Sequence, residues 1–233
     1  MSDDSLRETY DRIASHFSST REYPWPEVTE FLAEHGGDAV DSEGSSDAGD
    51  SEGSADDGER IGLDIGCGNG RHTGPLADYV DIAVGIDVSR GLLAEANVRA
   101  TDRGFDRNST FLQGDAGALP IADGTVDVGV YVATLHHLSP RARRIQSLEE
   151  LARVLGGDGV ALVSAWSTAH DRFDRESGFD TTVDWTLPDG ETVPRFYHIY
   201  DPEEFRADLE ASPLQLTSFE LSSGNCYGVV RPE

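Results

Sequence analysis

Lysine is absent from this 233-residue chain: all 18 basic residues are arginine, and 44 acidic residues bring the net charge to −26 at pH 7. Strong negative charge keeps a protein soluble in concentrated salt, where the screening length shrinks to about 3 Å at 1 M and self-repulsion weakens. The balance is typical of haloarchaeal proteins. It is the opposite of the basic balance with which proteins usually bind nucleic-acid phosphates.

Cysteine is scarce, and long apolar runs are missing. Cys67 and Cys226 offer neither a disulfide framework nor a metal-ligand spacing, so we expect no metal site in this chain. No apolar run approaches the 18 or so residues of a membrane span, and the first four residues lack the basic and then apolar character of a signal peptide. These absences predict a soluble, cytoplasmic protein that does not contact a membrane.

One segment of extreme composition divides the chain. Residues 36–59 contain only Gly, Ser, Ala, Asp, Glu and one Val, with nine acidic residues and no basic one. Such a segment cannot fold alone, so we predict a disordered, solvated linker or insertion. It separates an N-terminal helical arm, residues 1–35, from one folded domain, residues 60–233. The prolines at 24 and 26 predict a break between helices in the arm, which we expect to lie over the cofactor site.

Helix and strand patterns alternate after the linker. Apolar runs predict strands at 61–65, 82–86, 110–113, 126–132 and 160–164. Helical patterns lie between them, from about 71, from 89 to about 102, and from Ser139-Pro140 to Leu155 before Gly156-Gly157. A less regular segment reaches about 194, and then come a strand at 196–200, a helix capped by Asp201 and a hairpin turning at 222–225. The alternation predicts an α/β fold with a doubly wound, mostly parallel sheet.

Three glycines at alternate positions follow the first predicted strand, in the run Leu63-Asp64-Ile65-Gly66-Cys67-Gly68-Asn69-Gly70-Arg71. Glycine lets the main chain turn tightly and approach a ligand closely. Asp87, 21 residues after Gly66, is placed at the end of the next strand, where a carboxylate can accept both hydroxyls of a ribose. A dinucleotide motif has a third glycine, which receives a pyrophosphate, where this chain has Arg71. The pattern predicts a nucleoside cofactor rather than a dinucleotide.

The G-x-G-x-G pattern with Asp64 upstream resembles the first motif of the class I S-adenosylmethionine-dependent methyltransferases, whose Rossmann-like fold has a seven-stranded sheet with an antiparallel C-terminal strand. The resemblance implies that S-adenosylmethionine is the cofactor. In that family an acidic residue before a small one follows the third strand and meets the adenine, and Asp115-Ala116 stands in that place. The cofactor-binding residues that we predict are Asp64, Gly66, Gly68, Gly70, Asp87, Asp115, Ala116 and Ala133.

Residues after the fourth and fifth predicted strands should face the substrate, because ligands of open parallel sheets bind beyond the carboxyl ends of the strands. These are residues 133–138 and 165–167. A histidine of the pair His136-His137 can orient a substrate, act as a base, or merely cap and pack, and we favour a function for one of the two. Trp166 is either a wall on which a base stacks or part of the core.

Two segments make the resemblance more specific. His16 to Pro26 reads H-F-S-S-T-R-E-Y-P-W-P, and Arg195 to Tyr200 reads R-F-Y-H-I-Y. With the glycine motif and the histidine pair, they resemble, along nearly the whole chain outside the linker, the eukaryotic wobble-uridine tRNA methyltransferases. Those enzymes esterify 5-carboxymethyluridine.

This resemblance implies in-line attack of the uridine's carboxylate on the sulfonium methyl group. A carboxylate with a pKa near 4 is already ionised at pH 7, so the reaction needs alignment of the reactants and no general base. The catalytic residues that we predict are Arg21, His137, Arg195 and Tyr197, with Arg21 as the clamp on the carboxylate. The alternatives are a surface ion pair for Arg21 and packing of the arm for Arg195 and Tyr197.

Binding of tRNA by an acidic chain needs basic residues near the substrate mouth. Arg141, Arg143 and Arg144 form the one dense basic cluster of the sequence. On a helix they either face the RNA or only offset the nearby Glu149 and Glu150.

The resemblance also implies a partner, a small zinc-binding activator subunit that covers apolar surface on the sheet edge. We place this contact on the strand with Phe111 and Leu112. Two other functions stay open. A small-molecule methyltransferase would have the same fold and a different acceptor. A non-catalytic scaffold would keep the cofactor site without transferring a methyl group.

Overall fold

The computed structural model describes residues 3–37 and 58–233, with side chains from Leu6 onward. The predicted linker at 36–59 lies almost wholly outside the described residues, so its disorder stays a prediction. Within these two ranges, no helix is both long enough and apolar enough to cross a membrane.

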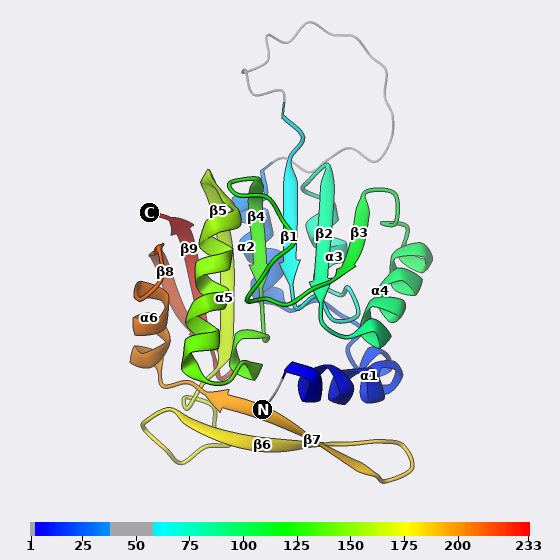
Figure 1. Ribbon diagram of the computed structural model, residues 1–233, viewed down its shortest axis with the longest axis vertical. Coiled ribbons are helices and arrows are strands. Elements are labelled where there is room, and N and C mark those ends of the chain that lie inside the picture. The colour runs from blue at the N-terminus through cyan, green and yellow to red at the C-terminus, as the bar shows by residue number, and fades with distance from the viewer. Residues whose placement is uncertain (1–2, 38–57) are drawn as a thin grey trace, which may run out of the picture.

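A seven-stranded sheet forms the centre of the molecule, in the order β3-β2-β1-β4-β5-β9-β8 (Figure 1). Neighbours from β3 to β5 pair in parallel, whereas β9 is antiparallel to both β5 and β8. The predicted α/β fold, with its mostly parallel doubly wound sheet and antiparallel C-terminal hairpin, is therefore confirmed. The strands are β1 Ile61–Ile65, β2 Ile82–Asp87, β3 Ser109–Gln113, β4 Val126–Tyr131, β5 Leu155–Trp166, β8 Leu214–Ser222 and β9 Asn225–Pro232.

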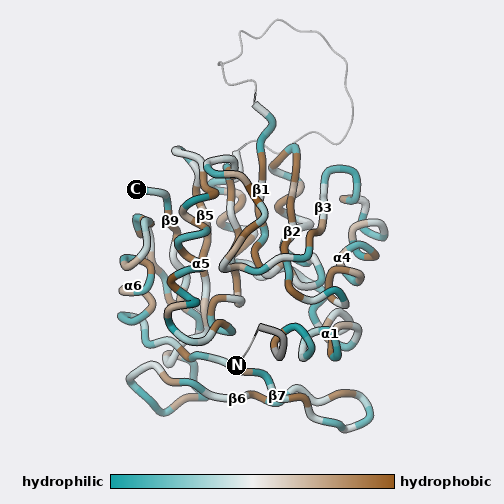
Figure 2. Tube along the Cα trace, in the orientation of Figure 1, coloured by the Kyte–Doolittle hydropathy of each residue, from teal (hydrophilic) through white to brown (hydrophobic). Residues whose placement is uncertain are grey.

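Helices cover both faces of the sheet, which explains why its central strands are apolar on both sides (Figures 1 and 2). On one face α5 (Arg141–Val154) and α6 (Pro202–Glu210) pack through Leu148, Leu151, Phe205 and Leu209. On the other face α2 (Pro26–His35) and α3 (Thr73–Ala77) pack through Val28, Leu32 and Leu76.

The helix α4, Arg90–Arg103, shows how local sequence sets the ends of an element. Ser89 precedes it, and its hydroxyl accepts a hydrogen bond from the backbone N–H of Leu92 at 3.1 Å. Gly104 ends it in the left-handed conformation, with φ of 79°. Asp201 caps α6 in the same way as Ser89, by accepting from the N–H of Glu203, as the sequence predicted.

Two details of the prediction were wrong. The segment expected to be irregular up to about 194 contains β6 (Phe179–Thr186), which pairs with β7 (Thr192–Ile199) in a separate antiparallel ribbon. Every second residue of β6 is polar and exposed, so the strand has no apolar run to reveal it. The strand β5 also begins at Leu155, directly after α5, so Gly156-Gly157 lie inside the strand and form no turn.

The N-terminal arm consists of α1, Asp3–Thr20, and α2, with the break where the prolines predicted it. Asp11 fastens α1 to the start of α4: its carboxylate accepts hydrogen bonds from the hydroxyl of Ser89 at 2.7 Å and the backbone N–H of Gly91 at 2.9 Å. Both α1 and the β6–β7 ribbon lie beyond the carboxyl ends of the parallel strands (Figure 1). Together they close the edge of the sheet where a ligand would bind.

Candidate active site

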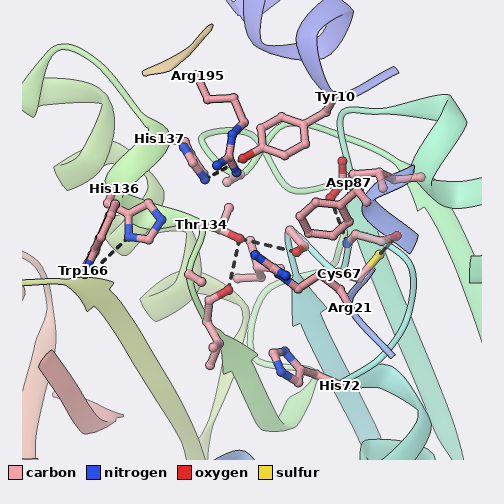
Figure 3. A pocket seen from close by; sticks show the side chains of 18 of the residues that line it. Tyr10, Arg21, Cys67, His72, Asp87, Thr134, His136, His137, Trp166 and Arg195 are labelled. Carbon is pink, nitrogen blue, oxygen red and sulfur yellow. Dashed lines mark hydrogen bonds between the residues drawn. The ribbon is translucent and has the colours of Figure 1, made fainter. Parts of the chain in front are cut away.

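A cavity of about 460 Å³ lies at the carboxyl ends of β1, β2, β4 and β5, under α1 and β7. Its wall contains the glycine loop after β1, the residues after β4 and the arginines of the arm and of β7 (Figure 3). The expectation that the arm lies over the cofactor site agrees with this arrangement, because Tyr10, Phe17, Arg21 and Trp25 all line the cavity.

The glycine loop turns back against β2. The N–H groups of Gly66 and Cys67 both donate to the carbonyl of Ile86, at 2.7 and 3.0 Å. Gly66 has a φ of 69°, and a Cβ atom there would collide with the side chain of Thr134. The loop therefore needs glycine at this position to pass the residues that follow β4.

Asp87 is buried at the end of β2, beside this loop. Its Oδ2 accepts from the N–H of Gly68 at 2.9 Å and its Oδ1 from the N–H of Ser89 at 2.8 Å. Burial raises the pKa of Asp87 to about 6, although both backbone hydrogen bonds oppose the shift. Each carboxylate oxygen can still accept a second hydrogen bond, so the pair of ribose hydroxyls expected here can be held.

Asp115, Ala116 and Ala133 also line the cavity. Asp115 accepts from the N–H of Gly117 at 2.8 Å and forms an ion pair of 2.5 Å with Arg143. Ala133 has a φ of 56°, unusual for a residue with a side chain, and its N–H donates to the hydroxyl of Ser164.

Asp64 and Gly70, two of the predicted cofactor-binding residues, do not line the cavity. Asp64 is fully buried, and its Oδ2 accepts from the hydroxyl of Thr73 at 2.7 Å. Burial raises the pKa of this carboxyl group to about 7. Asp64 thus joins the start of α3 to β1 and lies behind the cavity wall.

Arg195 on β7 and Arg21 after α1 both reach the cavity. Their guanidinium carbons lie 4.8 and 5.3 Å from the centre of the same ring, that of Trp185. Arg195 is only 8% exposed, and its Nε has no hydrogen-bond partner. Within the described residues neither guanidinium forms an ion pair with a carboxylate. In so acidic a chain, two arginines in one cavity wall without a carboxylate partner are able to bind an anion.

His137 lies beside Arg195 with both ring nitrogens engaged. One nitrogen, Nδ1, is 2.8 Å from the carbonyl of Phe196, and the other, Nε2, is 2.8 Å from the hydroxyl of Tyr10. Burial lowers the pKa of His137 to about 4, so the ring is neutral at pH 7. A carbonyl only accepts, so Nδ1 carries the proton and Nε2 accepts from Tyr10. Tyr197 packs on the same ring, at 4.4 Å between centroids.

Comparison with known proteins agrees with this geometry. A family model described as a methyltransferase domain matches residues 63–163. A putative methyltransferase of Encephalitozoon cuniculi is 32% identical over 200 residues, which cover 83% of this chain and 79% of that protein. The chain belongs to the S-adenosylmethionine-dependent methyltransferases. The CcbJ methyltransferase from Streptomyces caelestis shares the fold, with a TM-score of 0.72 at 18% identity over 98% of this chain and 99% of that one.

Two other relatives of the methyltransferase are named as tRNA (carboxymethyluridine(34)-5-O)-methyltransferases. The one from Mus musculus, ALKBH8, is 34% identical over 75% of this chain, and the one from Saccharomyces cerevisiae is 32% identical over 82%. The aligned regions cover 22% of the mouse protein and 59% of the yeast protein. The methyltransferase thus spans less than two thirds of either relative.

The arginine cluster at the start of α5 is committed to carboxylates of the methyltransferase itself. Arg141 pairs with Asp208 at 2.6 Å, and the buried Arg144 lies 3.5 Å from both Asp208 and Glu204. Arg143 pairs with Asp115, as described above. Glu150, one of the two expected alternative partners, pairs with Arg153 at 2.7 Å. The cluster therefore joins α5 to α6 and to Asp115 in the cavity wall.

Sequence reasoning missed Tyr10, the residue that bonds to His137. The only signal for it is helical spacing: Tyr10 stands seven residues before Phe17, and so on the same face of α1. The rings of Tyr10 and Phe17 do meet, at 6.1 Å between centroids, and both face the cavity. Its partner is 127 residues away in the sequence, so no local pattern predicts the bond.

Proposed function

We propose that this methyltransferase esterifies the carboxylate of 5-carboxymethyluridine, or a closely related modified uridine, at the wobble position of tRNA. The observation that carries the proposal is the pair of unpaired guanidiniums, Arg21 and Arg195, in the cavity wall. A methyl acceptor that is itself an anion gives both a partner. The activity for which the mouse and yeast relatives are named supports the same acceptor.

The glycine loop, Asp87 and Asp115 would hold S-adenosylmethionine, which supplies an electrophilic methyl group when bound. Their geometry fits that cofactor: Gly66, Gly68, Asp87 and Asp115 all line the cavity, and each carboxylate oxygen of Asp87 accepts only one hydrogen bond from the protein backbone and can accept another. This leaves Arg21 and Arg195, whose guanidiniums both lie near the ring of Trp185 in the cavity wall, to hold the acceptor.

Arg195 and Arg21 would bind the acceptor carboxylate and hold one of its oxygens in position for methyl transfer. Such alignment of two reactants can supply about 7 to 11 kcal/mol of the barrier. The acceptor is ionised at neutral pH, so the reaction needs no proton to be removed. His137 is consistent with this, because both its nitrogens are used within the protein. Its role, with Tyr197, is to hold the acceptor wall in shape.

We also propose tRNA as the polymer and a small zinc-binding activator subunit as the partner, in the cytoplasm. The strand β3 lies at the edge of the sheet, and Phe111 and Leu112 on it are only partly buried. A subunit that pairs with this edge would cover both. Basic residues on such a partner could bind the tRNA phosphates. They would replace the arginine cluster on α5, whose guanidiniums pair with carboxylates of this chain.

One competing function is methylation of a small molecule. It is favoured by the pairing of the α5 arginines with carboxylates of the chain, because paired arginines are less available to bind RNA phosphates. A scaffold that binds the cofactor without transferring its methyl group is the third outcome of the test below.

The test co-expresses the chain with a small zinc-binding activator subunit and supplies methyl-labelled S-adenosylmethionine at molar salt. The substrates are tRNA that carries 5-carboxymethyluridine and, as the control, the same tRNA with plain uridine. We expect label only in the first, released as methanol by mild alkali because a methyl ester hydrolyses. Label that withstands alkali would mean a different acceptor atom. No label in tRNA, with cofactor binding confirmed, would indicate the small-molecule enzyme or the scaffold.

A further inference from the structure

The two adjacent histidines after β4 differ in how they are bonded. His137 uses both ring nitrogens, whereas His136 uses only Nδ1, which lies 2.9 Å from the backbone nitrogen of Trp166. A backbone N–H can only donate, so Nδ1 of His136 accepts. Its Nε2 makes no hydrogen bond within the part of the chain that the structure describes.

The neutral ring of His136 therefore has its proton on Nε2. Its side chain is 3% exposed, and this burial, with Arg195 and His137 nearby, holds the pKa of His136 well below its usual range. At neutral pH the group is an uncharged N–H donor. Protonating Nδ1 would break the bond to Trp166, so the ring is not placed to accept a proton from a substrate.

The free nitrogen of His136 faces the cavity, which the residue lines (Figure 3). The surroundings are flat and aromatic: the ring of Tyr197 lies 5.0 Å from that of His136 and 5.3 Å from that of Trp166. These residues come from the ends of β4, β5 and β7, whereas the glycine loop and Asp87 lie at the ends of β1 and β2. The Nε2–H group of His136 therefore lies on the side of the cavity where we place the methyl acceptor, beside rings on which a base can stack.

We propose that His136 donates its Nε2–H to an uncharged oxygen of the methyl acceptor, such as a carbonyl of the pyrimidine ring, and that His136 rather than His137 contacts the substrate. The inference rests on the proposed function, because it assigns a donor in that same site. It divides the recognition of the acceptor in two: Arg21 and Arg195 take the carboxylate, and His136 takes the base. Trp166 and Tyr197 provide the flat faces between them.

Two substitutions separate the donor from the structural bond. In His136→Asn the amide oxygen can replace Nδ1 as the acceptor for Trp166, but no group reaches the position of Nε2. In His136→Gln the amide nitrogen can reach that position, but the acceptor for Trp166 is lost. His35→Asn, on α2 outside the cavity, is the matched control.

We expect His136→Asn to lower kcat/KM for the modified tRNA by roughly 10-fold or more, the effect of one lost hydrogen bond in a closed site, with cofactor affinity unchanged. His136→Gln should keep more activity than His136→Asn, and His35→Asn should match the wild type. Wild-type kcat/KM in His136→Asn would overturn the proposal. So would a His136→Gln variant weaker than His136→Asn, because the bond to Trp166 would then be the role of the ring.

A second measurement needs no substrate. Nitrogen-15 NMR of the full chain reports which ring nitrogen of His136 carries the proton, and we expect Nε2, from pH 6 to 9. A proton on Nδ1 would overturn the assignment. This result stands even where the wild type fails to methylate tRNA, an outcome that would reject the proposed function and not the donor.

Discussion

The hydroxyl of Tyr10 lies 2.8 Å from Nε2 of His137, and this bond joins α1 to the 3-10 helix Leu135–His137 that follows β4. The other ring nitrogen of His137 donates to the carbonyl of Phe196 on β7. One neutral imidazole therefore connects the arm, the end of the central sheet and the β6–β7 ribbon. The arm is part of the cavity wall, so we expect a substitution in α1 to affect methyl transfer.

Tyr10→Phe tests this connection. The ring stays, so packing against Phe17 is kept, but Nε2 of His137 loses its donor. We expect the free energy of unfolding to fall by about 0.5 to 1.5 kcal/mol, the usual net value of a hydrogen bond, and kcat/KM to fall by roughly 3- to 30-fold. Thermal or denaturant unfolding and initial rates measure the two effects. Tyr23→Phe, whose side chain is 70% exposed, is the control, and equal loss in both variants would contradict the assignment.

Arg195→Gln should separate activity from stability. Removal of the guanidinium should lower kcat/KM by at least roughly 10-fold, since hydrogen bonds to charged groups contribute about 1.5 to 3 kcal/mol. The free energy of unfolding should change little, because loss of the contacts with the rings of Trp185 and Tyr197 is offset by removal of a charge that is buried without a carboxylate partner. Arg195→Lys should remain impaired, since a point charge cannot replace a planar fork.

Arg231→Gln, whose guanidinium donates to the carbonyl of Asp158 away from the cavity, is the matched control for the Arg195 variants. Cofactor affinity should be the same in all of them. If Arg195→Gln unfolded more easily but kept its kcat/KM, Arg195 would be a packing residue of β7.

Local patterns predicted most of the sheet, because its buried strands are apolar runs bounded by glycines and helix caps. The strand β4, with five of six residues buried, and the capped helices α4 and α6 could be located from the sequence. By contrast, β6 alternates polar and half-buried residues, so it lacks such a run. Its stability comes from pairing with β7 and from Trp185, which packs on α1.

The site divides in the same way. The glycine loop and Asp87 follow directly from spacing along one βαβ unit. The acceptor wall joins α1, β4 and β7, and its bonds link residues more than 50 positions apart, such as His137 and Phe196. Contacts in the folded chain determine which of the two histidines has a ring nitrogen without a hydrogen bond, and which arginines lack a carboxylate partner. Neither property is visible in a sequence in which acids greatly outnumber arginines.

The raised pKa of Asp87, about 6, predicts how cofactor affinity depends on pH. Only the ionised carboxylate can accept from both ribose hydroxyls while its oxygens also accept from Gly68 and Ser89. Affinity should therefore be constant above pH 7 and fall as the pH drops through 6. In Asp87→Asn it should be weaker by roughly 1.5 to 3 kcal/mol at pH 8 and lose this dependence. Calorimetry at several pH values tests both, and a wild-type affinity that is flat to pH 5 would exclude the contact.

Asp64 should affect stability rather than binding. Its pKa is raised to about 7, so between pH 4 and 7 the folded protein holds more protons at this group than the unfolded chain does. Its contribution to the free energy of unfolding is thus present at low pH and lost as the pH rises through 7. In Asp64→Asn the decrease in the free energy of unfolding between pH 5 and 8 should be smaller than in the wild type by at least about 1.4 kcal/mol, the value of one pKa unit. Denaturant unfolding at pH 5 and 8 measures it, and identical differences in both proteins would contradict the burial argument.

Arg143→Gln asks whether the start of α5 belongs to the RNA site or to the cofactor site. The structure pairs Arg143 with Asp115, so the substitution should weaken cofactor binding. The pair is partly exposed, which limits the effect to about 1 kcal/mol or less. A phosphate contact would instead leave cofactor affinity unchanged and reduce the slope of log affinity for tRNA against log salt by about 1. Measuring both affinities at several salt concentrations separates the two roles, and we expect the slope to stay the same.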